Sequence, residues 1–194
     1  MDRREFIQTT ALGTVSGSLL LGALSGQEVS AQTTNSTRKE IPPMKIVVAA
    51  DPFATTLKDV IVKHLKEKGH EVTDVGSTTD KEIAYFDCCP VACKMLQEKK
   101  AERAILLCGT GMGMSVIANR YPSVVASCVE SVFATKMCRT INDANALCLG
   151  AMIWGEFMAC DAVDTFLSTG FTEALPQFAD FLKDAKKKVE TVRP

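Results

Sequence analysis

Residues 103–120 read RAILLCGTGMGMSVIANR, an apolar run that ends on a cysteine and passes into a turn of alternating glycines. The run predicts a buried strand and the segment after the glycines predicts a helix, so Cys108 stands where a strand ends. Gly109, Gly111 and Gly113 let the backbone approach a ligand closely, with N–H groups pointing inwards. Such a nest stabilises an oxyanion and favours the thiolate of a neighbouring cysteine, so we expect an active site here.

Two other interpretations of this stretch have to be weighed. Nucleotide sites also use glycine-rich turns, but no Gly-Lys-Ser/Thr follows and the glycines lack the dinucleotide spacing. Cys108 could also be no more than a packed strand residue, because cysteine behaves as a small hydrophobe in protein cores. The residues alone leave this second alternative open.

The rest of the chain alternates strands with helices. Strands are predicted at 44–51, 71–76, 103–108, 123–129 and 144–150, and helices at 55–70, 87–100, 113–120, 133–143, 155–168 and 175–190. This order predicts a three-layer α/β/α sandwich with a five-stranded parallel sheet, and Asp87 is expected to cap the second helix. Ligands of such sheets bind beyond the carboxyl ends of the strands, where we expect Asp51, Cys108 and the turn at residues 142–145.

The first 31 residues are predicted to be an export signal. Arg3 and Arg4 precede an apolar run rich in small residues, and Val29-Ser30-Ala31 fits a cleavage site. The arginine pair is typical of twin-arginine signals, which implies a periplasmic or otherwise exported protein without a membrane span after cleavage. The alternative is an uncleaved anchor, although the run is short for a span. Residues 32–43 are interpreted as a polar linker and residues 44–194 as the folded domain.

Composition disfavours nucleic acid as a partner and metal as a cofactor. The chain has 22 Lys and Arg, 23 Asp and Glu and a net charge of −1, with both signs interspersed. Its eight cysteines lie mostly inside apolar segments, which favours packing over disulfides. Cys89 and Cys93 are four apart on a predicted helix, but no CxxC spacing or nearby His completes a ligand set. We therefore expect neither a metal nor a cofactor.

Three segments in this order resemble one known family. They are MKIVVAAD (44–51), CGTGMGMSVIANR (108–120) and RTINDANALCLGA (139–151), and the likeness extends over residues 44 to about 170. The chain resembles the ribose-5-phosphate isomerase B and galactose-6-phosphate isomerase family. This resemblance implies a Rossmann-like fold, homodimers with active sites shared between subunits, and aldose–ketose isomerisation through a cis-enediolate without a metal.

The resemblance also implies roles for individual residues. Cys108 matches the base that shuttles a proton between two carbons of the sugar. Thr110 and the amides of Gly109, Gly111 and Gly113 match the group that holds the enediolate oxygen. Removing a proton beside a carbonyl needs a base and such preorganised donors, so the assignment is chemically consistent.

Three further positions match residues of the family that bind the substrate. Asp51 matches the acid that ends the first strand and binds sugar hydroxyls. Asn142 matches an Asn that reaches into the site of the partner subunit, and Tyr85 matches a pocket tyrosine. The expected ligand is a small sugar or sugar-like molecule, bound by a homodimer or higher homo-oligomer.

The chain departs from the family where the family binds phosphate and opens sugar rings. Pro52 and Ile141 replace two histidines, the second of which opens the ring. Met152, Leu175 and Ala179 stand where arginines hold the phosphate. Phosphate without arginine or lysine loses its charge-assisted hydrogen bonds, so we expect an unphosphorylated or atypical sugar that is open-chain or easily opened.

Two alternatives to this function remain. The first is a conventional isomerase of pentose or tetrose phosphates that uses other cations, with Arg120 and Arg139 as candidates. Arg139 can also be interpreted as a surface or interface charge. The second alternative is a sugar-binding module that has lost catalysis, although retention of Cys108 and Thr110 favours chemistry.

Overall fold

The computed structural model describes residues 41–192, so the predicted signal peptide and residues 32–40 of the predicted linker lie outside the described residues. Five strands form one parallel sheet in the order β2-β1-β3-β5-β4. In chain order they are β1 Lys45–Ala50, β2 Glu71–Asp74, β3 Arg103–Cys108, β4 Ala126–Cys128 and β5 Ala146–Gly150. The predicted Rossmann-like α/β/α fold is confirmed.

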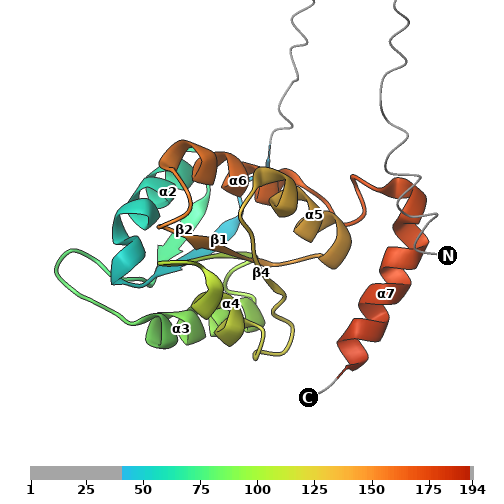
Figure 1. Cartoon of the computed structure of the whole chain (residues 1–194), viewed down its shortest axis with the longest axis horizontal. Helices are drawn as coiled ribbons and strands as arrows, with labels where there is room; N and C mark the ends of the chain where they lie inside the picture. Colours follow the sequence, from blue (N-terminus) through green and yellow to red (C-terminus); the bar gives the residue numbers. More distant parts are fainter. Residues whose placement is uncertain (1–40, 193–194) are drawn as a thin grey trace, which may run out of the picture. The chain divides into compact units, whose positions relative to one another are not determined.

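Helices cover both faces of the sheet (Figure 1). One face carries α2 Thr55–Glu67, α5 Val132–Asn142 and α6 Glu156–Ser168, which pack side by side. The other face carries α3 Tyr85–Gln97 and α4 Met112–Ala118. Two 3₁₀ turns, η1 Pro52–Ala54 and η2 Pro176–Phe178, complete the chain together with the last helix, α7 Ala179–Thr191. No helix among the described residues is long and apolar enough to cross a membrane.

The central strands are apolar on both faces because both faces are covered. In β1, Ile46 and Val48 point into the core beneath α2, α5 and α6, whereas Val47 and Ala49 point into the core beneath α3 and α4. Cys108 lies on this second face, as its alternation along β3 requires. All eight cysteines are free, and six of them are buried.

Helix α7 is held at the side of the sandwich by apolar contacts near its amino terminus and by an ion pair of Lys186. Phe178 and Leu182 are buried, whereas Phe181 and Val189 are more than half exposed. The helix contacts α5, and Lys186 Nζ bonds to Asp143 Oδ2 at 2.6 Å. The helix therefore leaves Phe181, in its first turn, and Val189, in its last turn, exposed to the surroundings of the chain.

Several predicted boundaries were wrong by a few residues; strand β2, for example, ends at Asp74 instead of residue 76. Helix α3 begins at Tyr85 with Ala84 in the capping position, so Asp87 lies in the first turn of the helix instead of capping it. Strand β4 covers only residues 126–128 of the predicted 123–129, because it is an edge strand that pairs with β5 over three residues.

Candidate active site

Asp51 and Cys108 lie together at the carboxyl edge of the sheet. Strands β1 and β3 are neighbours, with Ala50 opposite Leu107, and the Asp51 amide donates to the Leu107 carbonyl at 3.1 Å. In the sheet, β2 lies on one side of β1, and β3, the next strand along the chain, lies on the other side of β1. This reversal of direction is where open parallel sheets form their ligand crevices.

The glycine turn after β3 folds back over its own thiol. The Gly111 amide donates to Cys108 Sγ at 3.0 Å. Gly111 has a φ of +79°, and a Cβ there would lie 2.9 Å from the backbone carbon of Leu149. The turn also crosses β5 so closely that a Cβ on Gly150 would lie 2.6 Å from Thr110 C. Backbone geometry thus determines where the turn lies relative to Cys108.

Thr110 and Tyr85 flank the same turn. The Thr110 side chain is exposed, and its Oγ1 accepts from the Met112 amide at 3.4 Å. Tyr85 opens α3, and its ring packs so closely on Gly113 that a Cβ there would lie 2.9 Å from the ring carbon Cε2. The structure therefore brings Asp51, Cys108, Thr110, Tyr85 and the three predicted glycines to one edge.

Asp51 is buried, with an exposed fraction of 7%. Burial raises the pKa of its carboxyl, and the amides of Phe53 and Ala54 partly offset this; Phe53 N donates to Oδ1 at 3.0 Å. Cys88, which sequence reasoning treated only as core, lies nearby and donates from Sγ to the Ala50 carbonyl at 3.6 Å. Burial, reinforced by the charge of Asp51, raises the Cys88 pKa to about 11 and keeps this thiol protonated.

Apolar side chains lie beside the glycine turn that follows Cys108. Pro52 occupies the first position of η1, and Phe53 beside it is 73% exposed. Met152 is 68% exposed, and its Cε lies 3.2 Å from the position a Cβ of Gly109 would take. Lys58 lies below this edge, but it is buried and bonded to Asp74 and Asp59.

Asn142 lies at the opposite edge of the sheet, so its predicted position at the carboxyl ends was wrong. It is exposed at the end of α5, which begins after β4 at the carboxyl edge and returns to the amino edge, where β5 starts. Ile141 precedes it. Within one chain Asn142 and Cys108 are therefore not brought together.

Neither of the chain's two histidines is at the Cys108 edge. His64 is near the end of α2 and bonds to Asp164 at 2.7 Å, and His70 precedes β2 with its Nδ1 accepting from the Met44 amide. Leu175 and Ala179 flank η2, and Ala179 is the first residue of α7. Among residues 41–192, no three His, Cys, Asp or Glu side chains gather as a metal site requires.

Comparison with known proteins agrees with this geometry. A "4-deoxy-4-sulfo-D-erythrose isomerase" from Clostridium sp. (strain MSTE9) is 42% identical over 151 residues, covering 77% of this chain and 95% of that protein. "Ribose-5-P isomerase B" from Listeria innocua is 30% identical, covering 75% and 99%. The crystal structure of a ribose 5-phosphate isomerase from Thermotoga maritima matches with a TM-score of 0.69 and 34% identity, covering 77% and 99%.

The fold, the arrangement of Cys108 and the glycine turn, and these similarities define a class of enzyme, the aldose–ketose sugar isomerases. More particularly, the chain belongs to the Ribose/Galactose Isomerase family, whose model matches residues 46–178.

Proposed function

We propose that this enzyme interconverts a short acidic aldose and its ketose, with Cys108 moving the proton between the two carbons. The observation that carries the proposal is the Gly111 amide, which donates to Cys108 Sγ at 3.0 Å. A hydrogen bond from an amide strengthens when the sulfur becomes a thiolate, and the thiolate is the form that can act as a base.

The reaction follows from the groups around that thiol. Cys108 removes the proton from the carbon next to the carbonyl, and the electrons form an enediolate. The Thr110 hydroxyl and the amides of Gly109, Gly111 and Gly113 stabilise its negative oxygen. Asp51 accepts hydrogen bonds from the sugar hydroxyls. Return of the proton from Cys108 to the adjacent carbon, together with transfer of the hydroxyl proton from the oxygen that becomes the new carbonyl to the oxygen of the old one, gives the other isomer without a metal.

The substrate we propose is a four-carbon sugar with a terminal sulfonate, the kind named for the Clostridium relative. Without a hydroxyl on C4, such a sugar cannot close a five-membered hemiacetal, so it needs no ring-opening group. This agrees with Ile141 in the ring-opening position. A sulfonate carries one negative charge, whereas a phosphate ester carries −1.5 to −2 at pH 7, which agrees with an apolar rim at Phe53 and Met152.

We further propose a homodimer in which the partner subunit's Asn142 completes each site. Large apolar side chains lie exposed at the starts of the elements that face the Cys108 edge, namely Phe53, Phe86, Met112, Phe133 and Phe157. An exposed apolar collection of this kind marks interaction surfaces. In sedimentation at micromolar concentration the enzyme should run as a dimer or larger; a clean monomer would leave half of the proposed site missing.

The decisive experiment measures exchange and turnover with matched substrates. Purified enzyme is incubated in deuterium oxide with 4-deoxy-4-sulfo-erythrose, erythrose 4-phosphate and ribose 5-phosphate. We expect deuterium beside the carbonyl of the sulfosugar and at most weak incorporation into the phosphates. A preference for ribose 5-phosphate would support the alternative of a conventional sugar-phosphate isomerase. Absence of deuterium from all three sugars would favour a binding module.

A variant tests the base directly. Cys108→Ser keeps nearly the same volume and should retain the fold, while turnover falls by about 10²–10⁴-fold, as for a positioned acid–base group. Cys160→Ser, at a half-buried position of α6, serves as the control and should leave turnover unchanged. Full activity of Cys108→Ser would make the thiol structural.

Export is proposed from Arg3 and Arg4. Residues 1–40 fused to a reporter should direct export of the folded reporter, and changing both arginines to lysine should stop it. Continued export of the double variant would contradict a twin-arginine signal.

A further inference from the structure

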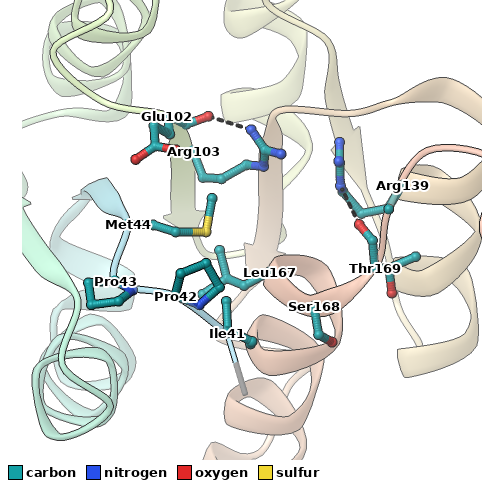
Figure 2. Close-up of a pocket in the computed structure, with 11 residues that line it drawn as sticks. Ile41, Pro42, Pro43, Met44, Glu102, Arg103, Arg139, Leu167, Ser168 and Thr169 are labelled. Atoms are coloured by element: carbon teal, nitrogen blue, oxygen red, sulfur yellow. Dashed lines mark hydrogen bonds between the residues drawn. The ribbon is translucent and has the colours of Figure 1, made fainter. Parts of the chain in front are cut away.

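A cavity of about 300 Å³ opens at the amino edge of the sheet, away from Cys108. Figure 2 shows Arg103 and Arg139 on its wall, together with apolar side chains that include Pro42, Met44 and Leu167. Arg103 begins β3 and Cys108 ends it, so five strand residues of about 3.3 Å each separate them by roughly 16 Å. The cavity is therefore distinct from the site around Cys108 in the same chain.

Arg103 has hydrogen-bonding capacity that the protein leaves unused. Its Nη1 donates to the Glu102 carbonyl at 2.8 Å, whereas its Nε is buried without a hydrogen-bond partner. The Glu102 carboxylate instead accepts from the Lys45 amide at 3.1 Å. Within residues 41–192 no carboxylate forms an ion pair with Arg103. A buried donor without an acceptor requires an explanation, and a bound ligand provides one.

Arg139 adds a second positive charge that cannot move. It is 4% exposed, so its interpretation as a surface charge was wrong. Nε donates to the Thr169 carbonyl at 3.2 Å, and Nη1 donates to Asp143 and to the Ala144 carbonyl. Asp143 also bonds to Lys186, so the single negative charge of its carboxylate is shared between two positive side chains. Burial and the charge of Arg139 both lower the pKa of Arg103, although the guanidinium stays protonated.

The hydroxyls beside the cavity do not favour a neutral sugar. Ser168 donates to the Asp164 carbonyl at 2.8 Å, and Thr169 donates to the Thr165 carbonyl at 2.7 Å. Both hydroxyl protons are thus bonded to backbone carbonyls of α6. The guanidiniums of Arg103 and Arg139 are therefore the side-chain donors that a ligand in the cavity would meet. A guanidinium presents a planar fork that matches the oxygens of carboxylates, sulfonates and phosphates.

We propose that this cavity binds a small organic anion, with its oxyanion head at the Arg103 guanidinium and a short apolar stem against Met44 and Leu167. The volume is at the lower end of that of small-molecule sites and admits a molecule of only a few carbons. Two sources of such an anion exist: a free organic acid, or the acidic end of a substrate whose other end lies in a partner's active site.

Calorimetric titration with sodium 1-butanesulfonate, at constant ionic strength, tests the proposal without measuring catalysis. The wild-type protein should bind saturably, and Arg103→Gln should bind at least about tenfold more weakly through loss of a charge-assisted contact. Arg103→Lys, which keeps the charge but not the fork, should fall in between. Arg120→Gln removes an exposed arginine elsewhere and should bind like the wild type, as should Cys108→Ser. Circular dichroism verifies that each variant is folded.

Absence of saturable heat with the wild-type protein, or equal affinity in Arg103→Gln, overturns the proposal. Loss of binding in Cys108→Ser also overturns it, because the anion would then occupy the isomerase site. Turnover measured with butanesulfonate separates the two sources. If butanesulfonate competes with the substrate, and Arg103→Gln abolishes this competition, the cavity binds the acidic end of a substrate. If butanesulfonate binds without competing, the cavity binds a free organic acid.

Discussion

At the scale of single residues, the sulfur of Cys108 has surroundings unlike those of the other thiols. It accepts the Gly111 amide at the crevice end of β3. Burial raises the pKa of Cys88, Cys138 and Cys148, which pack inside the two cores. The same residue type thus serves as core material on one part of the sheet and as a candidate base on another.

Selective alkylation tests this difference. Cys128 and Cys160 are more exposed than Cys108, whose exposed fraction is 5%. During brief iodoacetamide treatment near neutral pH, Cys108 should nevertheless label fastest, because its sulfur lies at the ligand crevice and accepts a hydrogen bond from the Gly111 amide. Mass spectrometry of the peptides over a pH series measures each rate. Labelling in the order of exposure would indicate an ordinary thiol.

Two glycines of the turn should respond differently to the same substitution. Gly111→Ala places a Cβ 2.9 Å from backbone at a φ of +79°, which should cost about 1–3 kcal/mol of unfolding free energy and displace the amide from Cys108. Gly109→Ala meets only the flexible end of Met152 at 3.2 Å and should cost less than about 1 kcal/mol. Urea unfolding of both variants measures the difference; equal losses would mean that the turn tolerates a side chain at Gly111.

At the scale of elements, the end of α5 holds α7 through charge. Asp143 closes α5 with a φ of 50° and bonds to Arg139 and Lys186. Although burial opposes its ionisation, these two cations hold the pKa of Asp143 below the ordinary carboxyl value. A carboxyl with a depressed pKa stabilises the fold above its unfolded-state value of about 4, and this contribution disappears as the pH falls through the folded-state value.

Asp143→Asn should therefore lose stability that depends on pH. Asparagine tolerates the left-handed backbone, so the substitution removes mainly the charge. At pH 6–7 the variant should be less stable by about 1 kcal/mol, and the difference from the wild type should shrink below about pH 4. Urea unfolding over this pH range measures it. Asp180→Asn, whose carboxylate is fully exposed in α7, should show no such trend; a constant difference for Asp143→Asn would rule out the charge as its cause.

Much of this architecture could be predicted because buried parallel strands are continuous apolar runs. The segment at 44–51 and that at 103–108 are apolar on both faces, which few other structures require. The apposition of Cys88 and Asp51 could not be predicted, since it joins residues 37 positions apart through the packing of α3 on β1. The edge occupied by Asn142 was predictable in principle, because a helix between parallel strands must end at the amino edge.

At the scale of the whole molecule, each chain carries the parts of the proposed site at two opposite edges. The proposed base, the glycine turn, Asp51 and Tyr85 are at the carboxyl edge, and Asn142 is at the amino edge, where the Arg103 cavity also opens. The sheet between them is fully buried at its centre. The sheet separates these two sets within one chain, which is why the proposed site includes the partner subunit's Asn142.

This separation can be tested by subunit complementation between two inactive variants. If Cys108→Ser and Asn142→Ala each inactivate a homodimer, a mixed dimer contains one site with both substitutions and one site with neither. Unfolding the two inactive variants together and refolding them should restore about a quarter of wild-type activity, because half of the dimers are then mixed and each has one intact site. Two substitutions on the same edge, such as Cys108→Ser with Asp51→Asn, should restore nothing. If only the first mixture is active, each chain contributes its Cys108 edge to one active site and its Asn142 to the other.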